Sequence, residues 1–171
     1  HDGSFGNACK LIEAAAEVGA DVVKFQTHIA NEETLKNAPS PSYFTDEDRY
    51  SYFERTSFSL NQWAKLKEIA NKNNLSFLSS PFSIKAVDIL ESINIDAFKI
   101  ASGEVTNLPL IEKIASTKKE VYISTGMSNF KEIDQALNIL KSAPYLTVMQ
   151  CSSIYPCPPE KVGINVIELM K

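Results

Sequence analysis

The feature that most limits the fold of this chain is an alternation of short β-branched or aromatic runs with stretches whose apolar residues recur at helical spacing. The expected strands are Asp21–Gln26, Leu75–Ser79, Ala97–Ile100, Val121–Ser124 and Leu146–Gln150. From the third run onward, each strand follows the previous one after a single short helix, which is the repeat length of a βα unit. The pattern therefore predicts an α/β fold with a parallel sheet.

The expected helices fill the stretches between these runs, where each presents one apolar face. They lie at Leu11 to Val18, Trp63 to Ala70, Val87 to Ile93, Leu110–Ala115 and Ile133–Leu140. Asn129 and Glu132, three residues apart, predict a capping box at the start of the last helix. The segment from Thr27 to Ser59 reads as irregular and contains Pro39 and Pro41. Because it is too long for an ordinary connection, it is predicted to be a functional βα loop over the mouth of the fold.

Two α/β architectures fit the alternation, the open doubly wound sheet and the closed (β/α)8 TIM barrel. The sequence has no GxGxxG or Walker motif to mark a nucleotide-binding switch point, and polar residues follow nearly every expected strand, as a barrel active site requires. The barrel is therefore the preferred prediction. Because only five strands are visible, residues 1–171 are expected to form a partial barrel, about strands 2 to 6 of a longer protein.

Charge and cysteine content argue against several functional classes. The chain carries 17 basic and 21 acidic residues, and its lysines are scattered without a basic run, so nucleic acid is not an expected partner. No apolar stretch approaches a membrane span, and no export signal is visible. Cys9, Cys151 and Cys157 form an odd set without a CxxC pair, which argues against a disulfide framework or a zinc ribbon. A cytoplasmic protein is the resulting prediction.

Polar side chains at the ends of the expected strands are the candidate functional residues, because they would converge on one mouth. They are Lys24, Gln26, Ser79, Ser80, Lys99, Ser102, Glu104, Ser124, Thr125, Gln150, Ser152, Ser153 and Tyr155. A lysine in an apolar strand, such as Lys24 or Lys99, needs a compensating anion or carboxylate. Either lysine could instead form an internal salt bridge or extend out of its strand. Two such lysines among hydroxyls and glycines favour an anion site.

Two short glycine-containing runs follow the third and fourth strands, Ala101–Glu104 and Ser124–Met127. Small residues there allow backbone N–H groups and hydroxyls to approach phosphate oxygens, although each glycine could simply turn the chain. A carboxylate at Glu104 would repel an anionic ligand in the same subsite. Glu104 is therefore expected either to face a second substrate or to pair with Lys99.

Several segments together resemble the sialic acid synthase family, whose members condense phosphoenolpyruvate with an acylamino sugar. The matching segments occur in family order and are His1–Ser4, Gly19–Thr27, Ser79–Ser83, Phe98–Glu104, Ser124–Met127 and Gln150–Pro156. The chain departs from the pattern at Gln150, where relatives often have histidine, and at Ser153, where some have asparagine. The polar contact at the end of that strand is therefore expected to differ.

The resemblance implies a function and a set of site residues. Phosphoenolpyruvate would be held by Lys24, Ser80, Lys99, Ser102, Ser124 and Ser153. Gln26, Glu104 and Tyr155 would face the N-acylated sugar, and Glu104, Lys99 and Lys24 would be the catalytic residues. The product would be a sialic acid-type nonulosonate, with release of phosphate.

The resemblance also implies components outside this chain. A divalent metal, Mn²⁺ or Mg²⁺, is expected in the full-length protein, with its ligands beyond residues 1–171. Further barrel strands and a C-terminal antifreeze-like domain are likewise expected outside the chain, and the full-length protein is expected to be a homodimer. His1 and His28 are expected in surface or loop roles rather than as metal ligands.

Two other functions remain open on the residues alone. A desolvated Lys99 or Lys24 could form an imine with a carbonyl substrate, which would make the protein a Schiff-base aldolase. Alternatively, the chain could be an inactive truncated barrel that only binds anions. Borohydride trapping separates the aldolase from the synthase, and metal-dependent turnover separates either enzyme from an anion-binding module.

Overall fold

In a computed structural model of the protein, residues 1–39 and 47–170 are described. The chain divides into two compact units, His1–Asp96 and Ala97–Lys171, and each is treated by itself. Pro41, which belongs to the expected loop over the mouth, lies outside the described residues. Within the described ranges, no helix is long and apolar enough to cross a bilayer.

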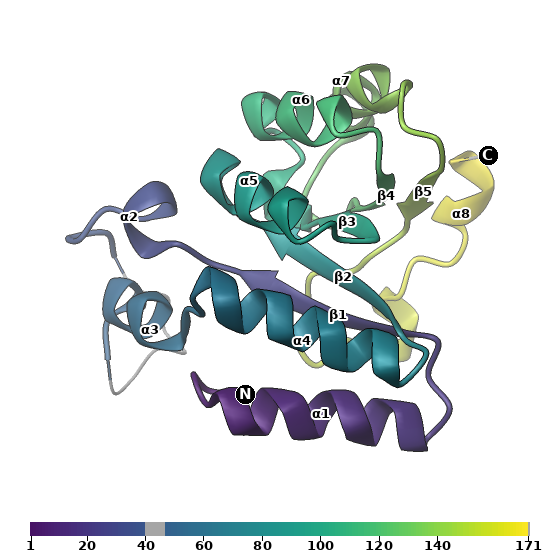
Figure 1. Cartoon of the computed structure of the whole chain (residues 1–171). Helices are drawn as coiled ribbons and strands as arrows, with labels where there is room; N and C mark the ends of the chain where they lie inside the picture. The colour runs from purple at the N-terminus through teal and green to yellow at the C-terminus, as the bar shows by residue number, and fades with distance from the viewer. Residues whose placement is uncertain (40–46, 171) are drawn as a thin grey trace. The chain divides into compact units, whose positions relative to one another are not determined.

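The first unit places two parallel strands against helices (Figure 1). Its elements are α1 (Phe5–Glu17), β1 (Val22–Thr27), α2 (Ala30–Glu33), α3 (Arg49–Thr56), α4 (Leu60–Lys72), β2 (Ser76–Pro81) and α5 (Ile84–Ser92). Helices α1 and α4 lie side by side. Three aromatic rings form the centre of the core, with Phe25 stacked on Phe77 at 5.5 Å and Trp63 edge-on to both. Burial of these large apolar rings stabilises this unit.

The second unit contains three parallel strands with helices between them. Its elements are β3 (Ala97–Ile100), the 3-10 turn η1 (Ser102–Glu104), α6 (Leu108–Ser116), β4 (Glu120–Ser124), α7 (Phe130–Leu140), β5 (Leu146–Met149), η2 (Pro159–Lys161) and α8 (Val166–Leu169). Fully buried side chains such as Ile111, Ile123 and Leu140 form its core. The predicted capping box of α7 is confirmed, because Asn129 and Glu132 exchange side-chain to backbone hydrogen bonds.

The expected strands are confirmed to within one or two residues at each end. The prediction that Thr27–Ser59 is irregular is wrong in part, because this connection contains α2 and α3. The carboxylate of Asp48 caps α3 by accepting hydrogen bonds from the N–H and hydroxyl of Ser51, and Phe53 is buried. A buried ring and a cap help to stabilise a short helix that hydrophobic periodicity does not reveal.

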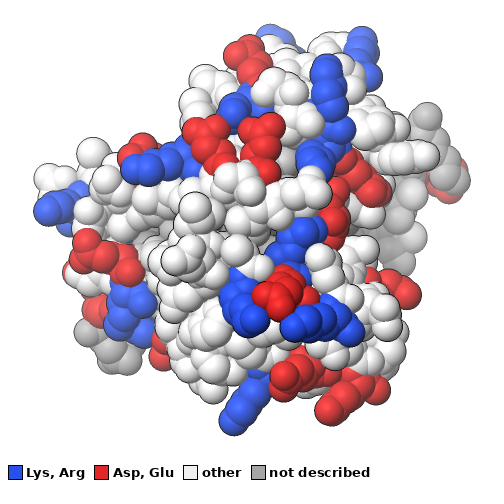
Figure 2. All heavy atoms as spheres, in the orientation of Figure 1, with Lys and Arg blue, Asp and Glu red and all other residues white. Residues whose placement is uncertain are grey.

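Acidic and basic side chains are interspersed on the face that Figure 2 shows. On α4, Lys65 and Lys72 both pair with Glu68, at 2.9 and 2.7 Å, and these hydrogen bonds lower the pKa of Glu68 to about 2. On this face the charge distribution therefore lacks the broad basic area that nucleic-acid binding uses.

Candidate active site

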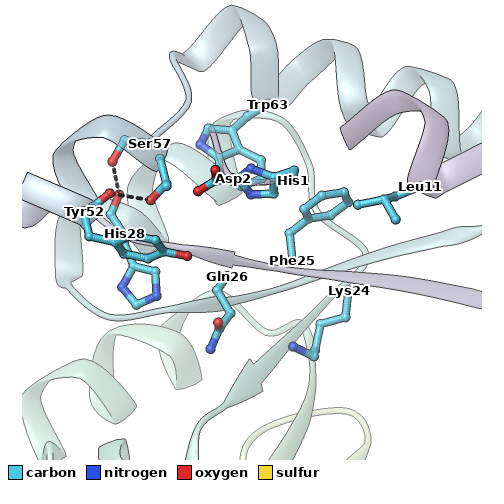
Figure 3. Close-up of a pocket in the computed structure, with 11 residues that line it drawn as sticks. His1, Asp2, Leu11, Lys24, Phe25, Gln26, His28, Tyr52, Ser57 and Trp63 are labelled. Atoms are coloured by element: carbon cyan, nitrogen blue, oxygen red, sulfur yellow. Dashed lines mark hydrogen bonds between the residues drawn. The ribbon is translucent and has the colours of Figure 1, made fainter. Parts of the chain in front are cut away.

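Strand β1 separates structural side chains from candidate functional ones. Phe25 and Thr27 are buried, whereas Lys24 and Gln26 are exposed to solvent. Figure 3 shows Lys24 and Gln26 pointing away from the side on which Phe25 meets Trp63. This follows from the two-residue period of a strand. The structure thus brings two of the predicted site residues onto one face of the first unit.

Ser80 joins this face through the register of the two strands. Gln26 pairs with Ser80 and Lys24 with Leu78, so the Ser80 side chain lies beside that of Gln26. Ser80 is 1% exposed, and its hydroxyl has no hydrogen-bond partner within the described residues. The neighbouring Ser79 is satisfied, because it shares a 2.7 Å hydrogen bond with Thr27 and donates to the carbonyl of Phe25 at 3.1 Å. A buried, unpartnered hydroxyl calls for a ligand atom or water.

Lys24 carries a charge that the described residues do not neutralise with an ion pair. Desolvation lowers the pKa of Lys24 below the usual lysine value, although the residue as a whole stays accessible to solvent. No neighbouring carboxylate contributes to this shift. An anionic ligand at this position would offset the desolvation cost.

A cavity of about 330 Å³ adjoins β1 (Figure 3). Lys24, Gln26 and His28 line it from β1 and the residue that follows the strand. Tyr52, Thr56 and Ser57 line it from α3 and its C-terminal end. These three hydroxyl-bearing residues were not among the predicted site residues. The four-residue spacing of Tyr52 and Thr56 was the available signal, because it places both side chains on one side of a helix.

In the second unit, Lys99 and Ser124 share one face of the sheet. Lys99 pairs with Tyr122 in register, and Ser124 lies two residues further along β4. The Tyr122 hydroxyl donates to Glu120 at 2.8 Å, which raises the pKa of Tyr122. Ser124 is 3% exposed and Lys99 is half-buried, whereas Val121 and Ile123 on the opposite face are fully buried. Tyr122 was not among the predicted residues, and only its alternation with Ser124 could have indicated it.

Ser102 and Ser153 meet the loop after β4 at Gly126. The Gly126 N–H donates to the Ser102 hydroxyl at 3.3 Å. A Cβ atom at Gly126 would lie 2.7 Å from both the Cys151 carbonyl oxygen and the Ser153 hydroxyl. Glycine is therefore required here by the close approach of the loop after β5, not by a turn.

Glu104, Gln150 and Tyr155 lie in different surroundings within the second unit. The Glu104 carboxylate accepts a hydrogen bond of 2.9 Å from the Asn107 amide, and Gln150 donates to the Val162 carbonyl at 3.3 Å. Tyr155 is 92% exposed. The predicted choice for Glu104, between a second substrate and Lys99, stays a prediction.

The histidines do not form a metal centre with other described residues. His1 accepts a hydrogen bond from the Gly3 N–H at 3.0 Å, and His28 is bonded to Glu33 at 2.8 Å. Among residues 1–39 and 47–170, no three His, Cys, Asp or Glu side chains are grouped so that they could hold a metal ion. The donor set of this part of the chain therefore does not fit the divalent metal that the resemblance implies.

Comparison with known proteins supplies the family context. The family model described as "NeuB family" matches residues 11–171. An N,N'-diacetyllegionaminic acid synthase of Campylobacter jejuni is 38% identical over 100% of this chain and 54% of its own length. A pseudaminic acid synthase of Helicobacter pylori is 33% identical over 100% of the chain and 52% of its own length. The chain thus spans about half the length of the curated relatives it matches.

A solved structure supports the α/β partial-barrel fold. The N-acetylneuraminic acid synthetase of Leptospira borgpetersenii, crystallised with citrate, matches 99% of this chain and 57% of its own chain with a TM-score of 0.85 and 25% identity. The predicted fold class is therefore confirmed.

Proposed function

The chain belongs to the NeuB family, and on that premise we propose that the protein condenses phosphoenolpyruvate with an N-acylated amino sugar to give a nonulosonate and phosphate. The observation that carries the proposal is the arrangement on β1 and β2. A desolvated Lys24 ammonium without an ion-pair partner among the described residues lies on the face that also holds Gln26 and the unpartnered Ser80 hydroxyl.

The proposed reaction brings anionic phosphate and carboxylate groups into the site, where their charge must be compensated. C3 of phosphoenolpyruvate forms a bond to the aldehyde carbon of the sugar, water adds its oxygen at C2, and the C2–O bond to phosphate breaks. One proton of the water ends on the new hydroxyl and the other on the released phosphate. Cationic side chains in a site of low dielectric stabilise the phosphate and carboxylate more strongly than in water.

We assign residues to this chemistry by their functional groups. Lys24 and Lys99 supply positive charge to phosphoenolpyruvate, and Ser80, Ser102, Ser124 and Ser153 supply hydroxyl contacts to the same substrate. Gln26, Glu104 and Tyr155 bind the sugar, and the Glu104 carboxylate is the group that can hold or relay a proton.

The decisive experiment uses the full-length protein that contains this chain. It is incubated in H2¹⁸O with phosphoenolpyruvate and individual acylamino hexoses, and product and phosphate are analysed by mass spectrometry. The proposal expects a sugar-dependent product with three added carbons and unlabelled phosphate, because water attacks carbon. Labelled phosphate, or no phosphoenolpyruvate-dependent product with any acylamino sugar, would overturn it.

The lowered pKa of Lys24 also favours a second candidate, the Schiff-base aldolase, because a neutral amine is the nucleophile in imine formation. Borohydride is added during turnover, and the peptides that contain Lys24 and Lys99 are then weighed. A substrate adduct on either lysine supports the aldolase. Unmodified lysines in an enzyme that is turning over support the condensing synthase.

A further inference from the structure

His28, the residue after β1, is held on three sides. Its ring is stacked between Phe53, at 3.9 Å and 6°, and Phe82, at 4.1 Å and 16°. Its Nδ1 is 2.8 Å from Glu33 Oε1, and the two side chains are only 15% and 6% exposed. One imidazole therefore joins β1 to α2 through Glu33, to α3 through Phe53, and to the end of β2 through Phe82.

Such an arrangement is a poor way to gain stability. Two polar side chains lose most of their hydration, and an apolar residue between the two phenyl rings would pack as well. The hydrogen bond to a carboxylate instead fixes which way the imidazole plane is turned, because the acceptor position selects one orientation and tautomer. The hydrogen bond between His28 and Glu33 therefore sets the orientation of the imidazole ring.

The contacts of His28 bear on the position of α3. The Ser57 hydroxyl, just after α3, is 2.9 Å from the His28 carbonyl oxygen (Figure 3). The Thr56 hydroxyl donates to the Tyr52 carbonyl at 2.8 Å. Tyr52 precedes the stacked Phe53 and lines the same cavity as Gln26. The ring stack on Phe53 and the Ser57 contact to the His28 backbone thus attach α3, which carries Tyr52, to the end of β1, which carries Gln26.

We propose that His28 is a positioning residue, which, bonded to Glu33 and stacked between Phe53 and Phe82, holds α3 so that Tyr52 and Gln26 together form the wall that binds the acylamino sugar. This inference rests on the proposed function. It assigns to α2 and α3 a role in affinity for the sugar and none in binding phosphoenolpyruvate.

The test compares Glu33→Leu with Glu33→Gln in the full-length protein. Leucine removes the hydrogen-bond acceptor, whereas glutamine keeps an acceptor oxygen of the same reach. Glu33→Leu should raise the KM for the sugar about tenfold, equivalent to about 1.4 kcal/mol, with the KM for phosphoenolpyruvate and kcat unchanged. Glu33→Gln should remain close to wild type. Glu32→Gln, on the same helix and 38% exposed, is the matched control.

Amide hydrogen exchange gives a readout that does not depend on turnover. In Glu33→Leu, residues 49–57 should exchange faster, while α4 keeps its wild-type protection as an internal standard. If wild type does not condense phosphoenolpyruvate with any acylamino sugar, the proposed function fails and exchange alone decides the positioning role. Unchanged exchange in residues 49–57 overturns that role. Parallel changes in both KM values and in melting temperature also overturn it, because they would mark a structural role.

Discussion

Two lysines of the first unit, Lys67 and Lys24, occupy opposite kinds of environment. The Lys67 side chain is 11% exposed and bonds Asp96 at 2.6 Å, while the same carboxylate accepts the Phe77 N–H at 2.8 Å. Lys24 is desolvated enough that its pKa falls, yet it forms no ion pair with a carboxylate within the described residues. The chain supplies the counter-ion of Lys67, which supports the fold, whereas at Lys24 we propose that a ligand supplies it.

The largest expected effect concerns Lys24. Lys24→Ala should raise the KM for phosphoenolpyruvate by about tenfold to a hundredfold in the full-length protein, because it removes a charge-assisted contact of about 1.5–3 kcal/mol. Steady-state kinetics with each substrate varied separately measures the change, and Lys65→Ala, at an exposed position of α4, is the control. An unchanged KM would remove Lys24 from the anion site.

At Lys67 we expect an effect on stability and none on substrate binding. Lys67→Ala should lower the free energy of unfolding by about 1–2 kcal/mol, because Asp96 loses its cationic partner and the lysine stem leaves the core. The KM for phosphoenolpyruvate should not move. Urea denaturation of the full-length variant measures the loss. A large rise in KM without loss of stability would contradict a structural role.

The two adjacent serines of β2 provide a finer version of the same comparison. Ser79→Ala should destabilise the fold by about 1 kcal/mol, since Thr27 loses its hydrogen-bond partner. Ser80→Ala should leave stability unchanged or slightly higher, because it removes an unpartnered hydroxyl, while weakening phosphoenolpyruvate binding a few-fold. Denaturation and calorimetric titration of both variants measure the contrast. Equal stability losses would show that Ser80 is satisfied within the fold.

The smallest effect is a pH dependence at Lys24. Because its folded pKa lies below 10.5, the unfolded state binds more protons as the pH rises from the folded pKa toward 10.5. In that window the stability of wild type should rise relative to Lys24→Gln, while affinity for phosphoenolpyruvate falls as the ammonium is lost. Denaturation and calorimetry across alkaline pH measure both trends. Lys24→Arg should bind phosphoenolpyruvate without this decline, and a decline that persists in it would point to another group.

Patterns within single segments predicted most of the fold and which candidate side chains share a face. The two-residue period of strands placed Lys24, Gln26 and Ser80, because alternation in each strand selects one face. The contacts of His28 with Glu33, Phe53 and Phe82 and the requirement for glycine at Gly126 were not predicted. Both depend on contacts between segments distant in sequence, and no local periodicity encodes how a loop packs against the next strand.

The alternation along β1 has a consequence for how such a protein can change over evolutionary time. Phe25 belongs to the packed aromatic core, whereas Lys24 and Gln26, its immediate neighbours, do not. Under the proposed function, substitutions at positions 24 and 26 should therefore alter what is bound without disturbing what is packed, and substitutions at 25 should do the reverse. Under the proposed function, positions of one strand that affect ligand preference and positions that affect stability can therefore change independently of each other.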